Sequence, residues 1–250
     1  MTVIEFETLD STNQYARDNF KDLADLTMIC ARTQTAGRGR LGRVWQSPRD
    51  VNIYASMVMK DLESGFHAGC ITGLAGITAL REFAPQINFF FKWPNDIYVR
   101  DRKIAGILCE SAGFTNGKID GVVAGIGLNI NFAPKDLRLL DNPATSLYEL
   151  TNEKFNLKKV INRLAFWFQE YYIAYTKESG SIFELWKQDN RLLGQKLTVI
   201  TPKGEVITGI FSNISNDGAM LLEVNNATIA FHCGDVKIDR ELIDWDNIHL

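Results

Sequence analysis

Residues 88–131 contain four strand-like segments in close succession, and this run limits the folds open to the chain more than any other feature. The segments cover residues 88–93, 96–100, 103–111 and 120–131, and turn-forming sequences stand at 100–102 and 115–117. Short strands joined by such turns pair with their neighbours in an antiparallel meander. We therefore predict a meandering sheet in the middle of the chain.

Two stretches with helical character flank this sheet. Residues 67–83 are rich in Ala, Gly, Leu and Ile, a composition that suits a helix packed closely against a sheet. Residues 157–175 repeat apolar side chains at helical spacing. The other predicted elements are strands at 3–6, 26–32 and 51–59 and helices at 13–20 and 182–193. The hydroxyls of Ser11 and Thr12 are predicted to cap the N-terminus of the first of these helices.

The sequence changes character from Gly194 onward. Short strand-like segments at 196–200, 206–212, 219–223 and 228–232 alternate with turn sequences. Their regular spacing favours a small β-barrel. We therefore predict two domains, residues 1–189 and residues 190–250.

Composition excludes several classes of protein. The chain has no apolar run of about 18 residues and no basic N-terminal region before an apolar segment, so neither a membrane span nor a secretion signal is predicted. The cysteines stand far apart, which predicts reduced thiols in the cytoplasm: Cys30, Cys70, Cys109 and Cys233. The net charge of −3 argues against a polynucleotide as the main ligand. The three histidines are far apart, so neither a Ser-His-Asp set nor a metal cage is predicted.

The densest basic cluster is a glycine-rich loop, GRGRLGR at residues 37–43, which Trp45 follows closely. Glycine lets a backbone approach a ligand or adopt a positive φ, and guanidinium groups suit phosphate and carboxylate oxygens. The loop therefore predicts an anion site that becomes ordered around its ligand. A solvated basic loop and an RG-type nucleic-acid contact stay open as alternatives from this motif alone.

A second motif, KWPND at residues 92–96, places a polar pair at a strand end. Pro94 lacks an N–H group and interrupts the strand, so Asn95 and Asp96 are presented beside the sheet. Strand ends often carry ligand contacts, but Asn and Asp also form turns by bonding their own backbone. Taken alone, the motif favours the structural turn.

Two strands that contain glycine follow. In RKIAGILCE (102–110), strict strand alternation predicts Lys103 and Gly106 on opposite faces. Gly106 indicates that another group lies close to the backbone, and the two glycines of GIGLNIN (125–131) indicate a bulge or a close approach beside the amide of Asn129. The GxGxxG spacing of a dinucleotide fingerprint is absent.

In their order along the chain, these motifs resemble the biotin–protein ligase family. The resemblance begins with Ser11-Thr12-Asn13, continues with Gln34 and the GRGRLGR loop, and runs through KWPND, RKIAGILCE and GIGLNIN. It implies an α+β catalytic domain of the class II aminoacyl-tRNA synthetase/biotin ligase type, in which helices back a mixed β-sheet. It also implies that the predicted C-terminal barrel is SH3-like.

The resemblance implies roles for individual residues. Catalytic roles fall to Lys103, Arg38 and Asp96, and Lys103 is the lysine that touches the reacting carboxylate and the α-phosphate. Biotin contacts fall to Ser11, Thr12, Asn13, Gln34, Gly37, Arg38, Arg40, Lys103 and Gly106. Nucleotide contacts fall to Arg40, Arg43, Trp45, Lys92, Asn95, Asp96, Lys103 and Asn129. Mg²⁺ is expected mainly on the ATP phosphates, with Asp96 as the side chain near it.

The implied activity is ATP-dependent formation of biotinyl-5′-AMP and transfer of biotin to a lysine of a biotin carboxyl carrier protein. The cofactors are ATP and Mg²⁺, and the assembly is a monomer or a homodimer. Some family members carry an N-terminal winged-helix domain, but few residues precede Ser11, so we expect no binding to DNA. A lipoate–protein ligase of the same fold and a non-catalytic nucleic-acid module are the alternative hypotheses.

Overall fold

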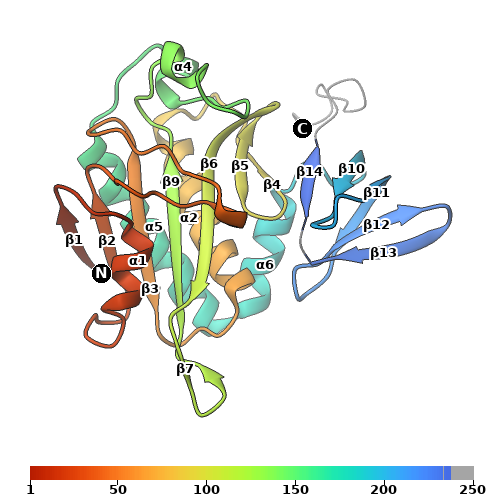
Figure 1. Ribbon diagram of the computed structural model, residues 1–250, viewed down its shortest axis with the longest axis horizontal. Helices are drawn as coiled ribbons and strands as arrows, with labels where there is room; N and C mark the ends of the chain where they lie inside the picture. Colours follow the sequence, from red (N-terminus) through yellow and green to blue (C-terminus); the bar gives the residue numbers. More distant parts are fainter. Residues whose placement is uncertain (233, 238–250) are drawn as a thin grey trace.

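A seven-stranded mixed sheet forms the body of the molecule in the computed structural model, which describes residues 1–232 and 234–237 (Figure 1). Across the sheet the strands are β1 (Thr2–Phe6), β2 (Thr27–Ala31), β3 (Ile53–Met59), β9 (Val122–Leu128), β6 (Arg102–Ser111), β5 (Asp96–Val99) and β4 (Phe90–Lys92). The pair β1–β2 is parallel and the other neighbouring pairs are antiparallel. The predicted meander is confirmed, because β4, β5, β6 and β9 are successive neighbours.

Helices cover both faces of this sheet. The long helices α2 (Gly65–Phe83) and α5 (Leu157–Lys177), with α6 (Ser179–Gln188), pack on one face, and α1 (Thr12–Asp18) lies on the other. Alternate strand residues therefore enter two cores: Met57 belongs to the core beneath α2, and Val58 to the core beneath α1. The mixed α+β fold with helices backing a mixed sheet is confirmed.

Helix α2 lies close to the sheet for a sequence reason. A Cβ on Gly73 would stand 2.8 Å from the ring of Phe91, and one on Gly76 would stand 2.7 Å from the side chain of Ile126. The small residues of α2 thus let strand side chains reach the helix backbone. The close packing predicted from its composition is confirmed.

Shorter elements connect these layers. They are the 3₁₀ turn η1 (Arg40–Gly42), the hairpin β7 (Phe114–Thr115) with β8 (Lys118–Ile119), and the helices α3 (Pro134–Leu137) and α4 (Leu147–Thr151). The hairpin lies at the predicted turn 115–117 and projects from the body in Figure 1. Strand β9 ends earlier than predicted because the carbonyl of Asn129 accepts a hydrogen bond from Leu147 at 3.1 Å instead of pairing in the sheet.

The C-terminal region forms a second, five-stranded antiparallel sheet. Its strands, in spatial order, are β13 (Ala227–Phe231), β12 (Met220–Val224), β11 (Val206–Ile214), β10 (Lys196–Ile200) and β14 (Asp235–Lys237). Four of these strands were predicted, and β14 was not. The sheet is joined to the body where the buried Trp93 Nε1 donates to the carbonyl oxygen of Gly218 at 2.9 Å.

Two further predictions concern cysteines and membranes. Cys30, Cys70 and Cys109 are free thiols, whereas Cys233 and residues 238–250 lie outside the described part of the chain. Within the described part, no helix is long and apolar enough to cross a membrane.

Candidate active site

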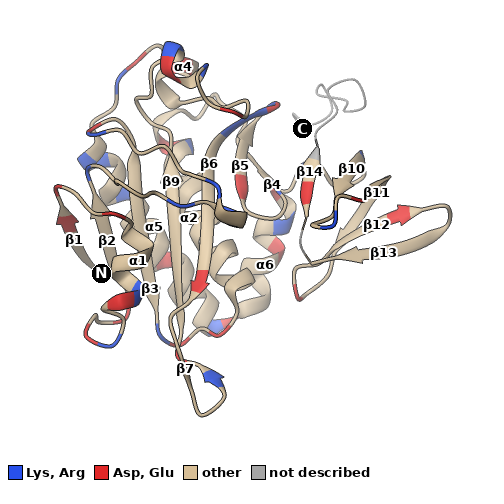
Figure 2. Cartoon of the chain, viewed as in Figure 1, with Lys and Arg blue, Asp and Glu red and all other residues tan. Residues whose placement is uncertain are grey.

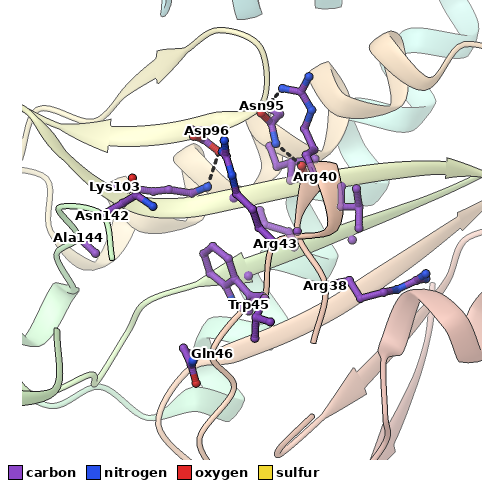
Figure 3. A pocket seen from close by; sticks show the side chains of 18 of the residues that line it. Arg38, Arg40, Arg43, Trp45, Gln46, Asn95, Asp96, Lys103, Asn142 and Ala144 are labelled. Atoms are coloured by element: carbon purple, nitrogen blue, oxygen red, sulfur yellow. Dashed lines mark hydrogen bonds and ion pairs between the residues drawn. The ribbon is translucent and has the colours of Figure 1, made fainter. Parts of the chain in front are cut away.

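One cavity gathers almost every residue that the motifs singled out. Its volume is about 560 Å³, and its wall is formed by strands of the large sheet and the 37–45 loop (Figure 3), together with the start of β14. The predicted site residues on its wall are Ser11, Thr12, Asn13, Gln34, Arg38, Arg40, Arg43, Trp45, Lys92, Asn95, Asp96, Lys103, Gly106 and Asn129. Segments far apart in the sequence thus converge on one hollow against the large sheet.

Trp45 packs directly against the backbone of Gly106 and Gly127, which together are called the glycine platform. A Cβ on Gly127 would stand within 2.5 Å of three atoms of the Trp45 indole, and one on Gly106 would stand 2.9 Å from the same ring. Any side chain at either position would displace the indole. The close approach predicted from these glycines is confirmed, and the approaching group is Trp45.

Lys103 lies over the same platform, which corrects one prediction. A Cβ on Gly106 would stand 2.8 Å from Lys103 Nζ, so the two residues share a face instead of facing opposite ways. The reason is a register shift between β5 and β6: Ile97 pairs with Ala105, but Tyr98 pairs with Lys103, so Ile104 is an extra residue. Such a bulge breaks strict alternation and re-aims the side chains on either side of it.

The ammonium of Lys103 has two partners in the cavity. Its Nζ lies 2.6 Å from Asp96 Oδ1 and 5.2 Å from the centre of the Trp45 ring. Next to Asp96, the side chain of Asn95 donates to the carbonyl of Ile107 at 2.6 Å and accepts from Arg40 Nη1 at 2.9 Å. The KWPND motif therefore contacts other parts of the site, and its polar pair does not serve only its own turn.

A chain of hydrogen bonds holds the polar end of the cavity, where α1 begins. Thr12 donates from its backbone N at 2.9 Å and from its hydroxyl at 3.2 Å to Gln34 Oε1. Ser56, which is fully buried, bonds to the hydroxyl of Thr12 at 2.7 Å and to Asn13 Oδ1 at 2.6 Å. Gly125 leaves room for this arrangement, since a Cβ there would stand 2.9 Å from Asn13 Cγ.

The basic loop crosses the cavity, and each of its arginines has a partner. Arg38 Nη2 lies 3.1 Å from Glu110 Oε2, Arg40 bonds to Asn95, and Arg43 pairs with Asp235 of β14. Figure 2 shows the loop as a basic segment in front of the sheet, with acidic residues at the end of β6 and in β14.

Gly37, at the base of this loop, is the predicted biotin contact that is not on the cavity wall. A Cβ on Gly37 would stand 2.7 Å from Ser47 Oγ, and its carbonyl accepts from Trp45 N at 2.9 Å. Glycine at this position therefore lets residues 37 and 45, the two ends of the loop, pack against each other. The positive φ expected of the loop glycines occurs at Gly42, where φ is 73°.

Two other predicted residues are deeply placed. Lys92 bonds to the hydroxyl of Tyr98 at 3.3 Å, and burial lowers the pKa of its ammonium despite the nearby Asp96. Asn129 is 4% exposed, its backbone N donates to the carbonyl of Ile104 at 2.9 Å, and its Oδ1 accepts from Asn52 at 3.4 Å.

Sequence reasoning missed two stretches of the wall. The segment 139–144 and the C-terminal residues Gly234, Asp235 and Val236 also line the cavity. The segment reaches the site because Lys103 N donates to the carbonyl of Pro143 at 3.1 Å. No local motif marks either stretch, and pairing with distant strands brings both to the site.

The carboxylates on the wall are Asp96, Asp141 and Asp235. Within the described residues, no group of three or more His, Cys, Asp and Glu side chains is arranged to hold a metal ion. Mg²⁺ keeps several waters and is held through one or two carboxylates together with substrate phosphates, so it needs no such cage. The oxygen donors present fit that mode of binding.

Comparison with known proteins identifies the family. The profile of the "Biotin/lipoate A/B protein ligase family" matches residues 5–129. The chain is 30% identical over 241 residues to the "Bifunctional ligase/repressor BirA" of Bacillus subtilis, and the match covers 94% of this chain and 74% of the relative. The chain therefore belongs to the biotin/lipoate A/B protein ligase family.

Other relatives bear narrower names. The chain is 30% identical over 218 residues to the "Biotin--[acetyl-CoA-carboxylase] ligase" of Mycobacterium tuberculosis, covering 85% of this chain and 79% of the relative. It is also similar to the structure described as "Biotin protein ligase from Aquifex aeolicus in complex with biotin and ATP". That match has a TM-score of 0.79 at 26% identity and covers 94% of this chain and 97% of the other.

Proposed function

We propose that this chain activates biotin as biotinyl-5′-AMP and transfers it to a lysine of a biotin carboxyl carrier protein. It is a biotin ligase that uses ATP and biotin. The observation that carries the proposal is the convergence of five cationic side chains on one cavity: Arg38, Arg40, Arg43, Lys92 and Lys103. A site built for two anionic substrates requires such a concentration of positive charge.

The first half-reaction joins a carboxylate to a phosphate. The biotin carboxylate is ionised at neutral pH, so its attack on the α-phosphate needs no general base. The enzyme must instead hold two anions together and stabilise the charge that develops as pyrophosphate leaves. Lys103 is suited to this role, because its Nζ lies at the Gly106–Gly127 platform between Asp96 and the Trp45 ring.

Mg²⁺ would neutralise phosphate charge when bound, with Asp96 as the carboxylate nearest to Lys103. Asp96 also restrains Lys103 at 2.6 Å and so keeps the ammonium aimed into the cavity. The Trp45 ring is the surface on which we place adenine. The hydrogen-bonded Thr12 and Gln34 form the end of the cavity that we assign to the biotin head group.

The second half-reaction transfers biotin to the carrier. A neutral lysine amine of the carrier attacks the acyl carbon, the bond between that carbon and the phosphate oxygen breaks, and AMP leaves with the electron pair. The attacking nitrogen then loses its extra proton. We propose that Asp96 assists this step by acting on the attacking amine. Its side chain is 17% exposed and lies on the cavity side of β5.

The mixed anhydride hydrolyses unless water is excluded from it. The 37–45 loop crosses the cavity and ends in Trp45, and its exposed apolar side chains Leu41 and Val44 suit a lid that buries them on closure. We therefore assign the loop a second role as cover for the adenylate.

Several finer features belong to the same proposal. We assign the five-stranded sheet to an SH3-like barrel and place the domain boundary at residues 189 and 190, just before β10. The three free cysteines support a cytoplasmic location. A monomer or a homodimer that binds no DNA is the expected assembly.

The test is to incubate the purified chain with ATP, Mg²⁺ and either biotin or lipoate, and to identify the bound product by mass spectrometry. A biotin carboxyl carrier domain is added in a second step. Retained biotinyl-5′-AMP, followed by a carrier heavier by one biotinyl group, is the expected result. Lipoyl-adenylate alone would assign the chain to lipoate ligation, and no adenylate with either acid would refute the proposal.

A further inference from the structure

Glu110 is a half-buried acidic residue that the sequence motifs left without a role. It lies near the end of β6, its side chain is 21% exposed, and it is not part of the cavity wall. Three side chains converge on its carboxylate: Arg17 at 3.0 Å, Asn13 at 2.9 Å and Arg38 at 3.1 Å. One group thus joins helix α1, which starts at the biotin end of the cavity, to the basic loop.

The three partners hold Glu110 in different ways. Arg17 bonds to Oε1, whereas Asn13 and Arg38 share Oε2. Asn13 has other fixed contacts, namely Ser56 at 2.6 Å and the carbonyl of Leu108 at 3.0 Å. Asn13 therefore keeps its position without Glu110, and Arg17 and Asn13 together hold the carboxylate rigidly.

Arg38 depends on Glu110 more than the other partners do. Its side chain is 40% exposed and comes from a loop, and Glu110 is the one side chain bonded to its guanidinium within the described residues. A guanidinium group has five N–H donors, so this bond leaves others free for a ligand carboxylate. In Figure 3, Arg38 extends along the edge of the cavity away from Lys103.

We infer that Glu110 is a positioning residue of this ligase, which holds the guanidinium of Arg38 in place to contact biotin. The inference rests on the proposed function, since it assumes that biotin is the ligand beside Arg38. A fixed partner reduces the conformational entropy that a long side chain loses when it binds. Removing the charge of Glu110 should therefore weaken biotin binding without changing the handling of ATP.

The experiment measures the Kd of biotin by titration calorimetry for the unchanged chain and for Glu110→Gln, Arg38→Met, the double variant and Arg17→Met. Arg17→Met is the matched control, because it breaks the other ion pair of Glu110 (3.0 Å) and Arg17 is not on the cavity wall. The thermal unfolding midpoint and the KM for ATP are recorded for each variant.

We expect Glu110→Gln to raise the Kd of biotin about tenfold, which corresponds to about 1.4 kcal/mol. Arg17→Met should stay within twofold of the unchanged chain, although it breaks one of the two ion pairs that Glu110→Gln breaks. The double variant should bind biotin no more weakly than Arg38→Met alone, because Glu110 acts through Arg38.

Several results would overturn the inference. They are an unchanged or lower Kd in Glu110→Gln, additive effects in the double variant, or an equal loss of affinity in Arg17→Met, which would make Glu110 a structural anchor for α1. If the unchanged chain binds no biotin, the proposed function fails, and the role of Glu110 fails with it. Biotin binding combined with any of the first three results rejects the role of Glu110 alone.

Discussion

Substituting Gly127 by alanine tests whether the position of Trp45 on the glycine platform is needed for the reaction. The new Cβ would stand within 2.5 Å of three atoms of the indole, and ordinary contact begins near 3.4 Å, so the ring must retreat by more than 0.9 Å. The ring is half-buried and belongs to a loop, so it can move into the cavity. We therefore expect a destabilisation at the low end of the ~1–3 kcal/mol typical of overpacking.

The effect on catalysis should be larger than the effect on stability. A misplacement of about 1 Å can reduce a rate by about 100-fold, because the reacting groups lose their alignment. Since the displaced ring lies beside Lys103, we expect kcat/KM for biotinyl-5′-AMP formation to fall between about tenfold and about 100-fold. The assay is pyrophosphate release with saturating ATP and varied biotin, with urea unfolding of the same samples.

Gly69→Ala is the matched control for this substitution. Gly69 lies within α2, and its Cβ would meet nothing closer than Cys109 Sγ at 3.7 Å. Alanine in a helix is favoured over glycine by about 1 kcal/mol, so this variant should be more stable and fully active. A Gly127→Ala enzyme with kcat/KM within twofold of the unchanged chain would refute the reasoning, because the ring would then not be needed where it lies.

Three further predictions concern single side chains. Lys103→Met should keep the fold by circular dichroism but slow adenylate formation by about 100-fold or more in single-turnover assays, since removing one preorganised charge partner costs about that much. Lys92→Met should raise the free energy of unfolding at pH 7 while impairing ATP binding. Burial lowers the pKa of Lys92 below its ordinary 10.5, so the buried charge lowers the free energy of unfolding at low pH. In urea titrations, the stability gained by Lys92→Met should therefore shrink as pH rises through the lowered pKa toward 10.5. Trp93→Phe should lower the free energy of unfolding by ~1–3 kcal/mol in the same urea assay, since it leaves the carbonyl of Gly218 without its 2.9 Å donor. An unchanged free energy of unfolding would show that water replaces the indole as donor.

The sequence predicted the elements whose cause is local. The meander of β4, β5, β6 and β9 follows from alternating apolar residues and turn sequences, and α2 follows from a helical pattern with small residues. The glycines at 106, 125 and 127 also revealed close approaches, since glycine within a strand leaves space that another group fills. The motif residues on the cavity wall were predicted together because the family resemblance depends on motifs and their order, which are themselves sequence features; segment 139–144 and residues 234–236 were not.

Tertiary structure decided which of these residues touch one another. The extra residue at Ile104 places Lys103 on the face of Gly106, and a bulge depends on the register of the neighbouring strand, which no local pattern specifies. Asp235 reaches Arg43 only because β14 pairs with β10 at the edge of the second sheet. Glu110 likewise gains its role from α1 and the basic loop, two segments that packing brings to one strand end. Periodicity and turn chemistry act over a few residues, whereas such contacts depend on the packing of elements far apart in the chain.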